Sequence, residues 1–261
     1  MTRGNLAEWL LAWLSIGLFA CLTCRAETVQ LVTYYNYSPW YFDASPERGL
    51  NAELARRLTA MSAGKYQFES VYVPRKRIDA MIQGGTKMVV PWVAPHFFGD
   101  ADRTKFLWTA PLMQDESLIV SSKNAPLEYD GPNSLRGKAF SAPAGHLFPD
   151  FSDLIASGQI RRDDAPSIKN ALMKLLLTRN VDFAVIDRST FNALKADESM
   201  DMSKFHLARV PRTPSYARHI LVTRNNPVLF EFVSKAVTRL SREEGWIDLS
   251  MYSKPPVGLH R

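Results

Sequence analysis

The chain has 261 residues, a length that allows one large domain or two small ones. A hydrophobic content of 46% and a charged content of 22% are typical of a globular protein that can bury a sizeable core. The formal net charge is +6, but the basic residues are scattered and form only short runs, at Arg161–Arg162 and Arg75–Arg77. This pattern argues against binding to nucleic acid, which needs a clustered basic surface.

Residues 1–26 have the pattern of a secretory signal peptide. A positive charge at Arg3 is followed by an apolar segment at residues 9–22, which is shorter than a membrane-spanning helix. Small residues then precede Glu27, as a signal peptidase requires. We therefore expect export and cleavage before Glu27. A lipid anchor on Cys21 is the alternative that the sequence leaves open.

Cysteine usage limits the chemistry of the exported chain. The two cysteines, Cys21 and Cys24, both lie within the predicted signal. Residues 27–261 therefore contain no cysteine, which excludes a disulfide, a thiolate nucleophile and a cysteine-ligated metal site. We expect the hydrophobic core to hold the exported chain together.

The first part of the exported chain predicts alternating strands and helices. The expected strands are Val29–Thr33, Tyr66–Val73 and Met88–Val93, and the expected helices begin at Asn51, as N-cap, and at Arg75. This βαβαβ order implies a parallel sheet with ligands at the carboxyl ends of its strands. Four candidate site residues fall just after such strand ends: Tyr37, Trp40, Trp92 and Arg103.

The stretch that follows the first expected strand is unusually aromatic, with six aromatic residues among the nine at positions 34–42. These rings are either a lid over the core or stacking walls for a ligand, and the sequence leaves both open. Arg103 lies in a polar loop between two β-type runs. A guanidinium there is either a solvated cation or an anchor that pairs bidentately with a ligand carboxylate.

The second part of the chain begins where the composition becomes polar, at residues 121–137. A helical stripe at 168–176 precedes a buried strand at 181–186, which ends in Asp187. Asp187 is either a ligand contact or the N-cap of a helix over 188–196. A strand at 205–210, a return crossing at 211–214, a strand at 219–223 and a last helix capped by Asn226, with Pro227 at its first position, complete the prediction.

Several motifs, in their order and spacing, resemble family 3 of the bacterial extracellular solute-binding proteins. The matching segments are Tyr37-Ser38-Pro39-Trp40, Asp102-Arg103 with Thr109-Ala110-Pro111, the run 181–187 and Gly245-Trp246-Ile247. By this resemblance Arg103 binds the ligand carboxylate, Asp187 holds a ligand ammonium group, and Tyr37 and Trp40 pack on the ligand. Gly145 and His146 match a helix N-terminus that binds the carboxylate. The chain departs from the family at Leu112, where an aromatic residue is usual, and at His146, where a hydroxyl residue is usual.

The resemblance implies an α/β protein with the two-lobed type II fold of periplasmic binding proteins. Each lobe is a mostly parallel sheet flanked by helices, and two crossing strands form the hinge. Residues 27–117 and 213–261 would make lobe 1, and residues 118–212 would make lobe 2. The implied protein is a periplasmic monomer that captures an amino acid or related carboxylate and delivers it to an inner-membrane ABC permease.

Two other classes of function stay open. Some proteins of this fold are dehydratases, and an exported sensor or adaptor domain is the second alternative. The sequence contains none of the common motifs of serine hydrolases, zinc proteases, P-loop proteins or dinucleotide-binding proteins. We therefore expect no catalytic residue, no metal and no cofactor.

Overall fold

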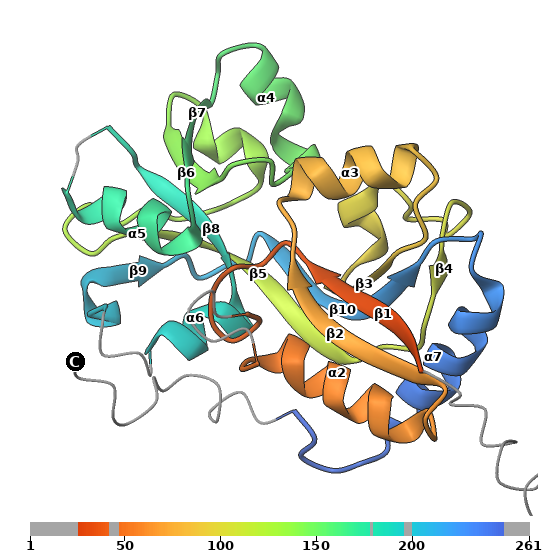
Figure 1. Cartoon of the computed structure of the whole chain (residues 1–261). Helices are drawn as coiled ribbons and strands as arrows, with labels where there is room; N and C mark the ends of the chain where they lie inside the picture. The colour runs from red at the N-terminus through yellow and green to blue at the C-terminus, as the bar shows by residue number, and fades with distance from the viewer. Residues whose placement is uncertain (1–25, 42–46, 178–179, 196–199, 248–261) are drawn as a thin grey trace, which may run out of the picture.

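The computed structural model describes residues 26–41, 47–177, 180–195 and 200–247, which form two α/β halves side by side (Figure 1). Residues 1–25, which hold nearly all of the predicted signal and both cysteines, lie outside the described residues. Within the described ranges, no helix combines the length and the apolar character needed to cross a membrane. The arrangement confirms the predicted two-lobed α/β fold.

The first half is built on three parallel strands, β1 (Glu27–Thr33), β2 (Tyr66–Tyr72) and β3 (Val89–Val93). Two helices connect them, α2 (Leu50–Met61) and α3 (Arg75–Gln83). β1 lies in the middle and pairs with β2 on one side and with β3 on the other. This is the predicted βαβαβ unit, and it directs the carboxyl ends of the strands toward the second half.

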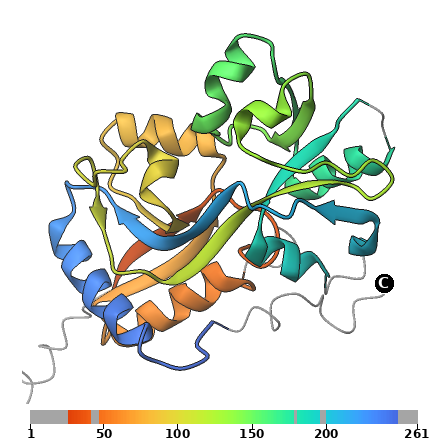
Figure 2. The same cartoon turned by 180° about the vertical axis from the view of Figure 1, so that it is seen from behind.

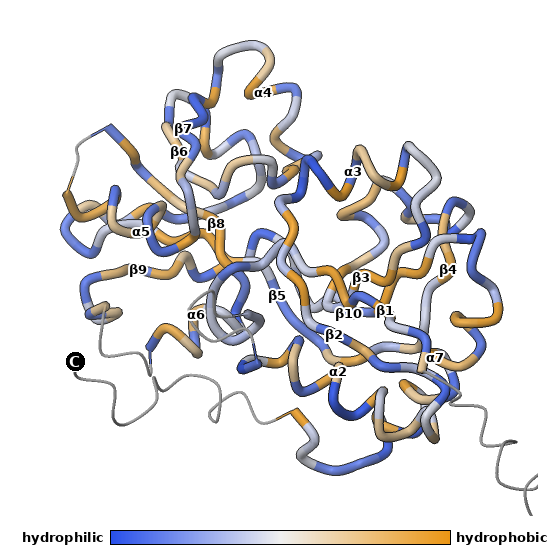
Figure 3. The backbone as a smooth tube through the Cα atoms, viewed as in Figure 1, coloured by the Kyte–Doolittle hydropathy of each residue, from blue (hydrophilic) through white to orange (hydrophobic). Residues whose placement is uncertain are grey.

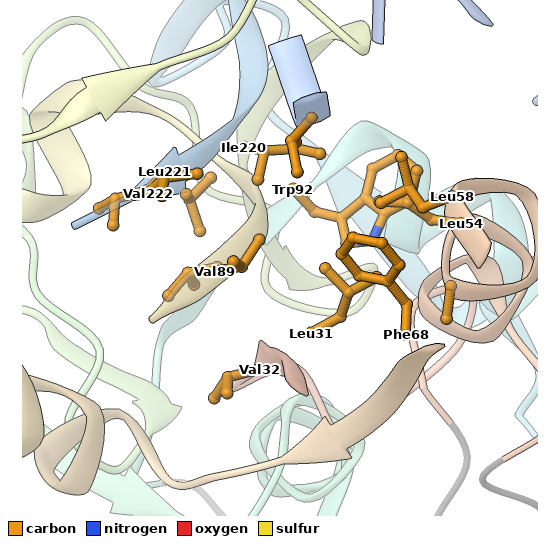
Figure 4. Close-up of a cluster of buried hydrophobic side chains, with 14 of the residues drawn as sticks. Leu31, Val32, Leu54, Leu58, Phe68, Val89, Trp92, Ile220, Leu221 and Val222 are labelled. Carbon is orange, nitrogen blue, oxygen red and sulfur yellow. The ribbon is translucent and has the colours of Figure 1, made fainter. Parts of the chain in front are cut away.

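The core of the first half forms where the helices α2 and α7 (Pro227–Leu240) cover the sheet (Figures 1 and 3). Apolar residues at helical spacing on α2, such as Leu54 and Leu58, pack against alternate residues of the strands, such as Leu31 (Figure 4). Each fully buried aliphatic side chain contributes roughly 1.5–3 kcal/mol relative to an exposed one. This core therefore supplies a rigid base for the residues at the strand ends.

The second half repeats the design with three parallel-paired strands and covering helices. β6 pairs in parallel with β7 and with β8, and one buried cluster lies on each side of this sheet. The elements are β6 (Ala139–Pro143), α4 (Ser152–Ala156), β7 (Arg161–Ala165), α5 (Ile168–Leu177), β8 (Phe183–Asp187) and α6 (Arg188–Lys195).

Short 3-10 helices occur in both halves of the chain. They are η1 (Pro95–Phe98), which follows β3, and η2 (Pro132–Leu135), η3 (Pro149–Phe151) and η4 (Met202–Lys204).

Two long antiparallel strands, β5 (Met113–Ser122) and β10 (Thr213–Val222), join the halves (Figure 2). β10 pairs with β3 in the first half, and β5 pairs with β8 in the second. The sheet order is β2-β1-β3-β10-β5-β8-β6-β7, with the short strands β4 (Leu107–Trp108) and β9 (Phe205–Leu207) at its side. The predicted lobe boundary at 117/118 falls inside β5, and the one at 212/213 falls where β10 begins. That the lobes move about these points remains a proposal.

Asn51 differs from its predicted role as the N-cap of α2. The N-cap is Gly49, and Asn51 lies inside the helix, fully buried. Its side-chain amide donates to the carbonyl oxygen of Leu31 (3.0 Å) and to the hydroxyl of Ser70 (2.8 Å). The side chain therefore fastens α2 to β1 and β2, because a buried amide needs such partners.

We predict that Gly49→Ala destabilises the fold more than Gly64→Ala. Both glycines have a positive φ, +90° and +84°, so each alanine should cost about 1–2 kcal/mol from backbone strain. A Cβ at Gly49 would lie 2.7 Å from the carbonyl oxygen of Trp40, whereas nothing lies within 4 Å of one at Gly64. Overpacking should add roughly 1–3 kcal/mol at Gly49. Urea unfolding of both variants measures the difference, and equal midpoints would contradict it.

Candidate functional site

A partly open cavity lies between the two halves, at the carboxyl ends of the strands. Its volume is about 60 Å³. A single water needs about 10–15 Å³, so the cavity in this arrangement has room for a molecule of only a few heavy atoms. Aromatic, histidine and charged side chains from both halves line it, and they include Tyr34, Tyr35, Tyr37, Arg75, His96, Phe97, His146, Phe148, Asp187 and Arg212.

Beneath the cavity lies a fully buried arginine, Arg218, on the crossing strand β10. Its Nε donates to Asp115 (2.7 Å) and its Nη2 pairs with Asp187 (2.6 Å). The hydroxyls of Tyr35 and Tyr216 each accept at 3.0 Å. Burial alone would lower the pKa of Arg218, but Tyr216, Asp187 and the other anionic or acidic neighbours raise it well above its ordinary value. The guanidinium is therefore permanently charged.

The two carboxylates that pair with Arg218 have different surroundings. Asp115 on β5 also accepts from the backbone N–H groups of Glu116 and Ser189 and from the Ser189 hydroxyl. Asp187 lies at the end of β8 and faces the cavity, with Oδ1 accepting from the Tyr216 hydroxyl at 2.7 Å. Burial raises the pKa of Asp187, and the pairing with Arg218 opposes that rise.

Aromatic rings enclose the Arg218 guanidinium. Its central carbon lies 4.5 Å from the ring centre of Trp40 and 5.4 Å from that of Tyr35. Tyr216 and Phe97 are next, at 5.4 Å and 5.9 Å. Rings within about 6 Å of a cation attract it through their negatively charged faces. The cluster thus holds a cation by ion pairs at the edges and by aromatic faces around it.

Two further arginines line the cavity, one from each side of the hinge. Arg75, the first residue of α3, pairs with Asp79 (2.9 Å) and donates to the carbonyl oxygen of Phe97 (2.7 Å). Its Nη1 has no hydrogen-bond partner within the described part of the chain. Arg212 forms a two-pronged ion pair with Asp150. Arg75 is consequently the cation that retains donors for a ligand.

Two histidines of the cavity wall are neutral. Burial, together with the nearby cations Arg75, Arg162 and Arg218, lowers the pKa of His146 to about 3. Burial and the nearby Arg212 also lower the pKa of His96. A neutral imidazole carries one N–H donor and one acceptor nitrogen. Both rings can therefore bind a polar ligand without adding charge.

Three of the predicted site residues line the cavity: Tyr37, His146 and Asp187. Burial and the charge of Asp187 raise the pKa of Tyr37 well above its ordinary value, so its hydroxyl stays a proton donor. Asp187, predicted as either ligand contact or N-cap, directs its oxygens to Tyr216 and Arg218 in this structure. Whether these three residues contact a ligand remains a prediction.

Two predicted site residues, Trp40 and Trp92, are fully buried and do not line the cavity. Trp92 lies in the core of the first half, among aliphatic side chains (Figure 4). Trp40 packs against Trp92 at 5.6 Å and donates its indole N–H to the Thr190 hydroxyl on α6 (3.1 Å). Some rings of the aromatic stretch therefore cover the core and others line the cavity, and stacking of the latter on a ligand remains a prediction.

Arg103 lies outside this cavity, in a neighbouring open hollow that is also lined by His96, Tyr216 and His219. It is exposed, and its Nη2 lies 3.2 Å from Nε2 of His219. Nδ1 of His219 faces the carbonyl oxygen of Thr109 at 2.8 Å and must donate to it, so Nε2 accepts from Arg103. The predicted carboxylate anchor thus lines a different hollow from Asp187.

Gly145 and His146 do not begin a helix, which corrects the expectation that came with the resemblance. They form a turn, in which Gly145 has a φ of +82°, and the next helical element, η3, begins at Pro149. Phe148 precedes a proline, which disfavours a helical backbone at that residue. Gly145 does not line the cavity, although a Cβ there would lie 3.3 Å from the Lys76 side chain of the first half.

Sequence reasoning did not select Arg75, His96 and Arg212 of the cavity wall, or Arg218 beneath it. Arg75 and His96 follow the carboxyl ends of β2 and β3, so the same strand-end rule that selected Tyr37 could have found them. Arg218 gave one signal, a charged residue directly before the strand expected at 219–223. Its partners are distant in the sequence, so that signal did not identify its role.

No protein-family model matches the sequence, and no curated protein matches it. Solved structures do match its fold. An ancestral arginine-binding protein bound to arginine has a TM-score of 0.64 at 16% identity, over 85% of this chain and 96% of the other. Holo ArgBP from T. maritima has a TM-score of 0.62 at 15% identity, over 83% and 92%.

A third similar structure is the ancestral amino acid-binding protein AncCDT-1, a precursor of cyclohexadienyl dehydratase. It has a TM-score of 0.62 at 14% identity, over 87% of this chain and 96% of the other. At these identities the likeness shows the fold. The chain therefore has the two-lobed fold of the amino-acid-binding periplasmic proteins.

The low pKa of His146 predicts a loss of stability in acid that depends on this residue. The folded protein keeps the ring neutral down to a pH of about 3, whereas an unfolded histidine takes up a proton near a pH of about 6.5. As the pH falls from 7 to 5, proton uptake by His146 in the unfolded chain should lower the free energy of unfolding by about 1–2 kcal/mol. Urea unfolding at both pH values should show a smaller loss for His146→Gln than for the original protein. Equal losses of stability in the two proteins would contradict the low pKa given to His146.

Proposed function

We propose that this protein is a periplasmic solute-binding protein that captures a small polar ligand, an amino acid or a related carboxylate, between its two halves. It then delivers the ligand, as a monomer, to an inner-membrane ABC permease. One observation carries the proposal: a cavity at the junction of the two halves has charged and hydrogen-bonding groups from both of them. A ligand that bridges such groups stabilises the closed arrangement of the halves.

The location of the cavity supports this function. Arg75 and His96 come from the first half, and His146 and Asp187 come from the second. Because β5 and β10 are the two long connections, a small bend in them would open the cavity further to solvent. The fold neighbours include structures described as amino-acid-binding proteins, which is consistent with a ligand of this size and polarity.

The first test is a thermal-shift panel of amino acids and small carboxylates, followed by calorimetric titration. A ligand at about one hundred times its Kd should stabilise the protein by roughly 2.7 kcal/mol. The cavity chemistry predicts that at least one small carboxylate or amino acid gives such a shift. A panel in which no compound of either class shifts the unfolding temperature would oppose the proposed function.

The second test concerns the anchor for the ligand carboxylate. Arg75 lines the cavity with a free Nη1, whereas Arg103, which the resemblance favours, lies in the neighbouring hollow. We predict that Arg75→Gln weakens the best ligand at least about tenfold, which corresponds to about 1.4 kcal/mol. Arg77→Gln, at an exposed position on the same helix, is the matched control and should bind normally. A large loss of ligand affinity in Arg103→Ala, with no loss in Arg75→Gln, would identify Arg103 as the residue that binds the carboxylate.

An enzyme on the same fold is the second candidate, because one fold neighbour is described as the precursor of a dehydratase. The partly buried Asp187, with its raised pKa, is the residue that such chemistry would use. We expect the bound ligand to be released unchanged, as judged by mass spectrometry after long incubation. Conversion of the ligand that disappears in Asp187→Asn would make the enzyme the better description.

A further inference from the structure

The aromatic and acidic cluster below the cavity has the construction of a site for an organic cation. Such sites surround a guanidinium or ammonium group with aromatic faces and supply a carboxylate. Here the faces belong to Trp40, Tyr35 and Tyr216, and the carboxylate next to the cavity belongs to Asp187. The cation that fills this site is the side chain of Arg218, which is fully buried.

Asp187 is the one acidic residue among the described residues that line the cavity, so a ligand amine would have to pair with it. Both of its oxygens already accept charged or strongly polar donors, Oδ2 from Arg218 at 2.6 Å and Oδ1 from Tyr216 at 2.7 Å. The other carboxylate of the cluster, Asp115, does not line the cavity and is covered by Ser189 and backbone N–H groups. A ligand ammonium would therefore compete with a resident guanidinium.

The remaining polar groups of the wall suit an anion. Arg75 has an unused Nη1, and the Tyr37 hydroxyl has no hydrogen-bond partner within the described ranges. Both His96 and His146 offer a ring N–H. Arg75, Arg162 and Arg218 add to the effect of burial in lowering the pKa of His146, so positive charge lies close to this part of the wall. A carboxylate placed there would gain hydrogen bonds and a favourable field.

We propose that Arg218 permanently occupies the cation-binding part of the cleft, so that the ligand of this cavity is a small carboxylate that carries no amine. This inference rests on the proposed function and narrows its ligand class. An amino acid would bring an ammonium group into a cleft where the matching carboxylate is already paired. An amine-free carboxylate of similar size would meet Arg75 and the neutral histidines without that conflict.

Matched pairs of ligands test the proposal on the unaltered protein. Calorimetric titration would compare acetate with glycine, propionate with alanine, and succinate with aspartate, where the members of each pair differ only by the amine. We expect the amine-free member of a binding pair to bind at least about tenfold more tightly. Equal or tighter binding of the amino acid would overturn this inference and leave the proposed function intact. Binding by neither member of any pair would count against both.

A variant supplies the reverse test. Replacing Arg218→Met together with Asp115→Asn removes one charge of each sign and leaves Asp187 facing the cavity without its guanidinium. In each pair, the ratio of the Kd of the amino acid to the Kd of the amine-free carboxylate should then fall at least about tenfold. A cooperatively folded variant with an unchanged preference would overturn the role given to Arg218. If this variant does not fold, the relative affinities of the unaltered protein for the two members of each pair decide whether the proposal holds.

Discussion

The buried guanidinium of Arg218 is the interaction on which the arrangement of the two halves depends. Removing a charge from water is costly, and an unpaired partner left after its loss typically costs about 3–5 kcal/mol. The structure meets this cost with two carboxylates, two phenol hydroxyls and the carbonyl oxygen of Trp92. These partners come from β5, β8, β3, β10 and the segment after β1, so one side chain fixes how both halves meet at the crossing strands.

The same cluster explains why the aromatic stretch after β1 is so dense. Tyr35 contributes a hydroxyl to Arg218, and Trp40 contributes a ring face and then reaches Thr190 in the second half. Tyr37 packs against buried residues of both halves. These rings therefore connect the cores of the two halves around a charge, and Tyr34, Tyr35 and Tyr37 also line the cavity. Opening of the cleft would have to exchange the Trp40–Thr190 contact for water.

The fold could be predicted from the sequence because its signals are local. The stripe on α5 and the alternation in β2 follow from neighbouring residues, and Pro227 marks the start of α7 as predicted. The buried cluster could not be predicted in this way. Asp115 and Arg218 are 103 residues apart, and each taken alone looks like a polar residue near the end of a strand. Only the pairing of β5 with β10 brings them together.

Arg103 shows that the position of a motif residue depends on contacts that the motif does not contain. The loop that carries it is held by the buried Asp100, which accepts from the backbone N–H groups of Lys105 and Phe106 and from the indole N–H of Trp108. Arg103 itself sits at a turn with a φ of +59°.

The η1 helix precedes this loop and directs it toward β10, where Nε2 of His219 accepts from Arg103. The motif preserves the strand, the loop and the next strand, whereas the direction of the guanidinium depends on these distant hydrogen bonds. A positive charge near the cleft is still required for a carboxylate ligand, and α3 supplies one at its first residue, Arg75. The cavity thus has a positively charged residue in its wall although Arg103 faces a neighbouring hollow.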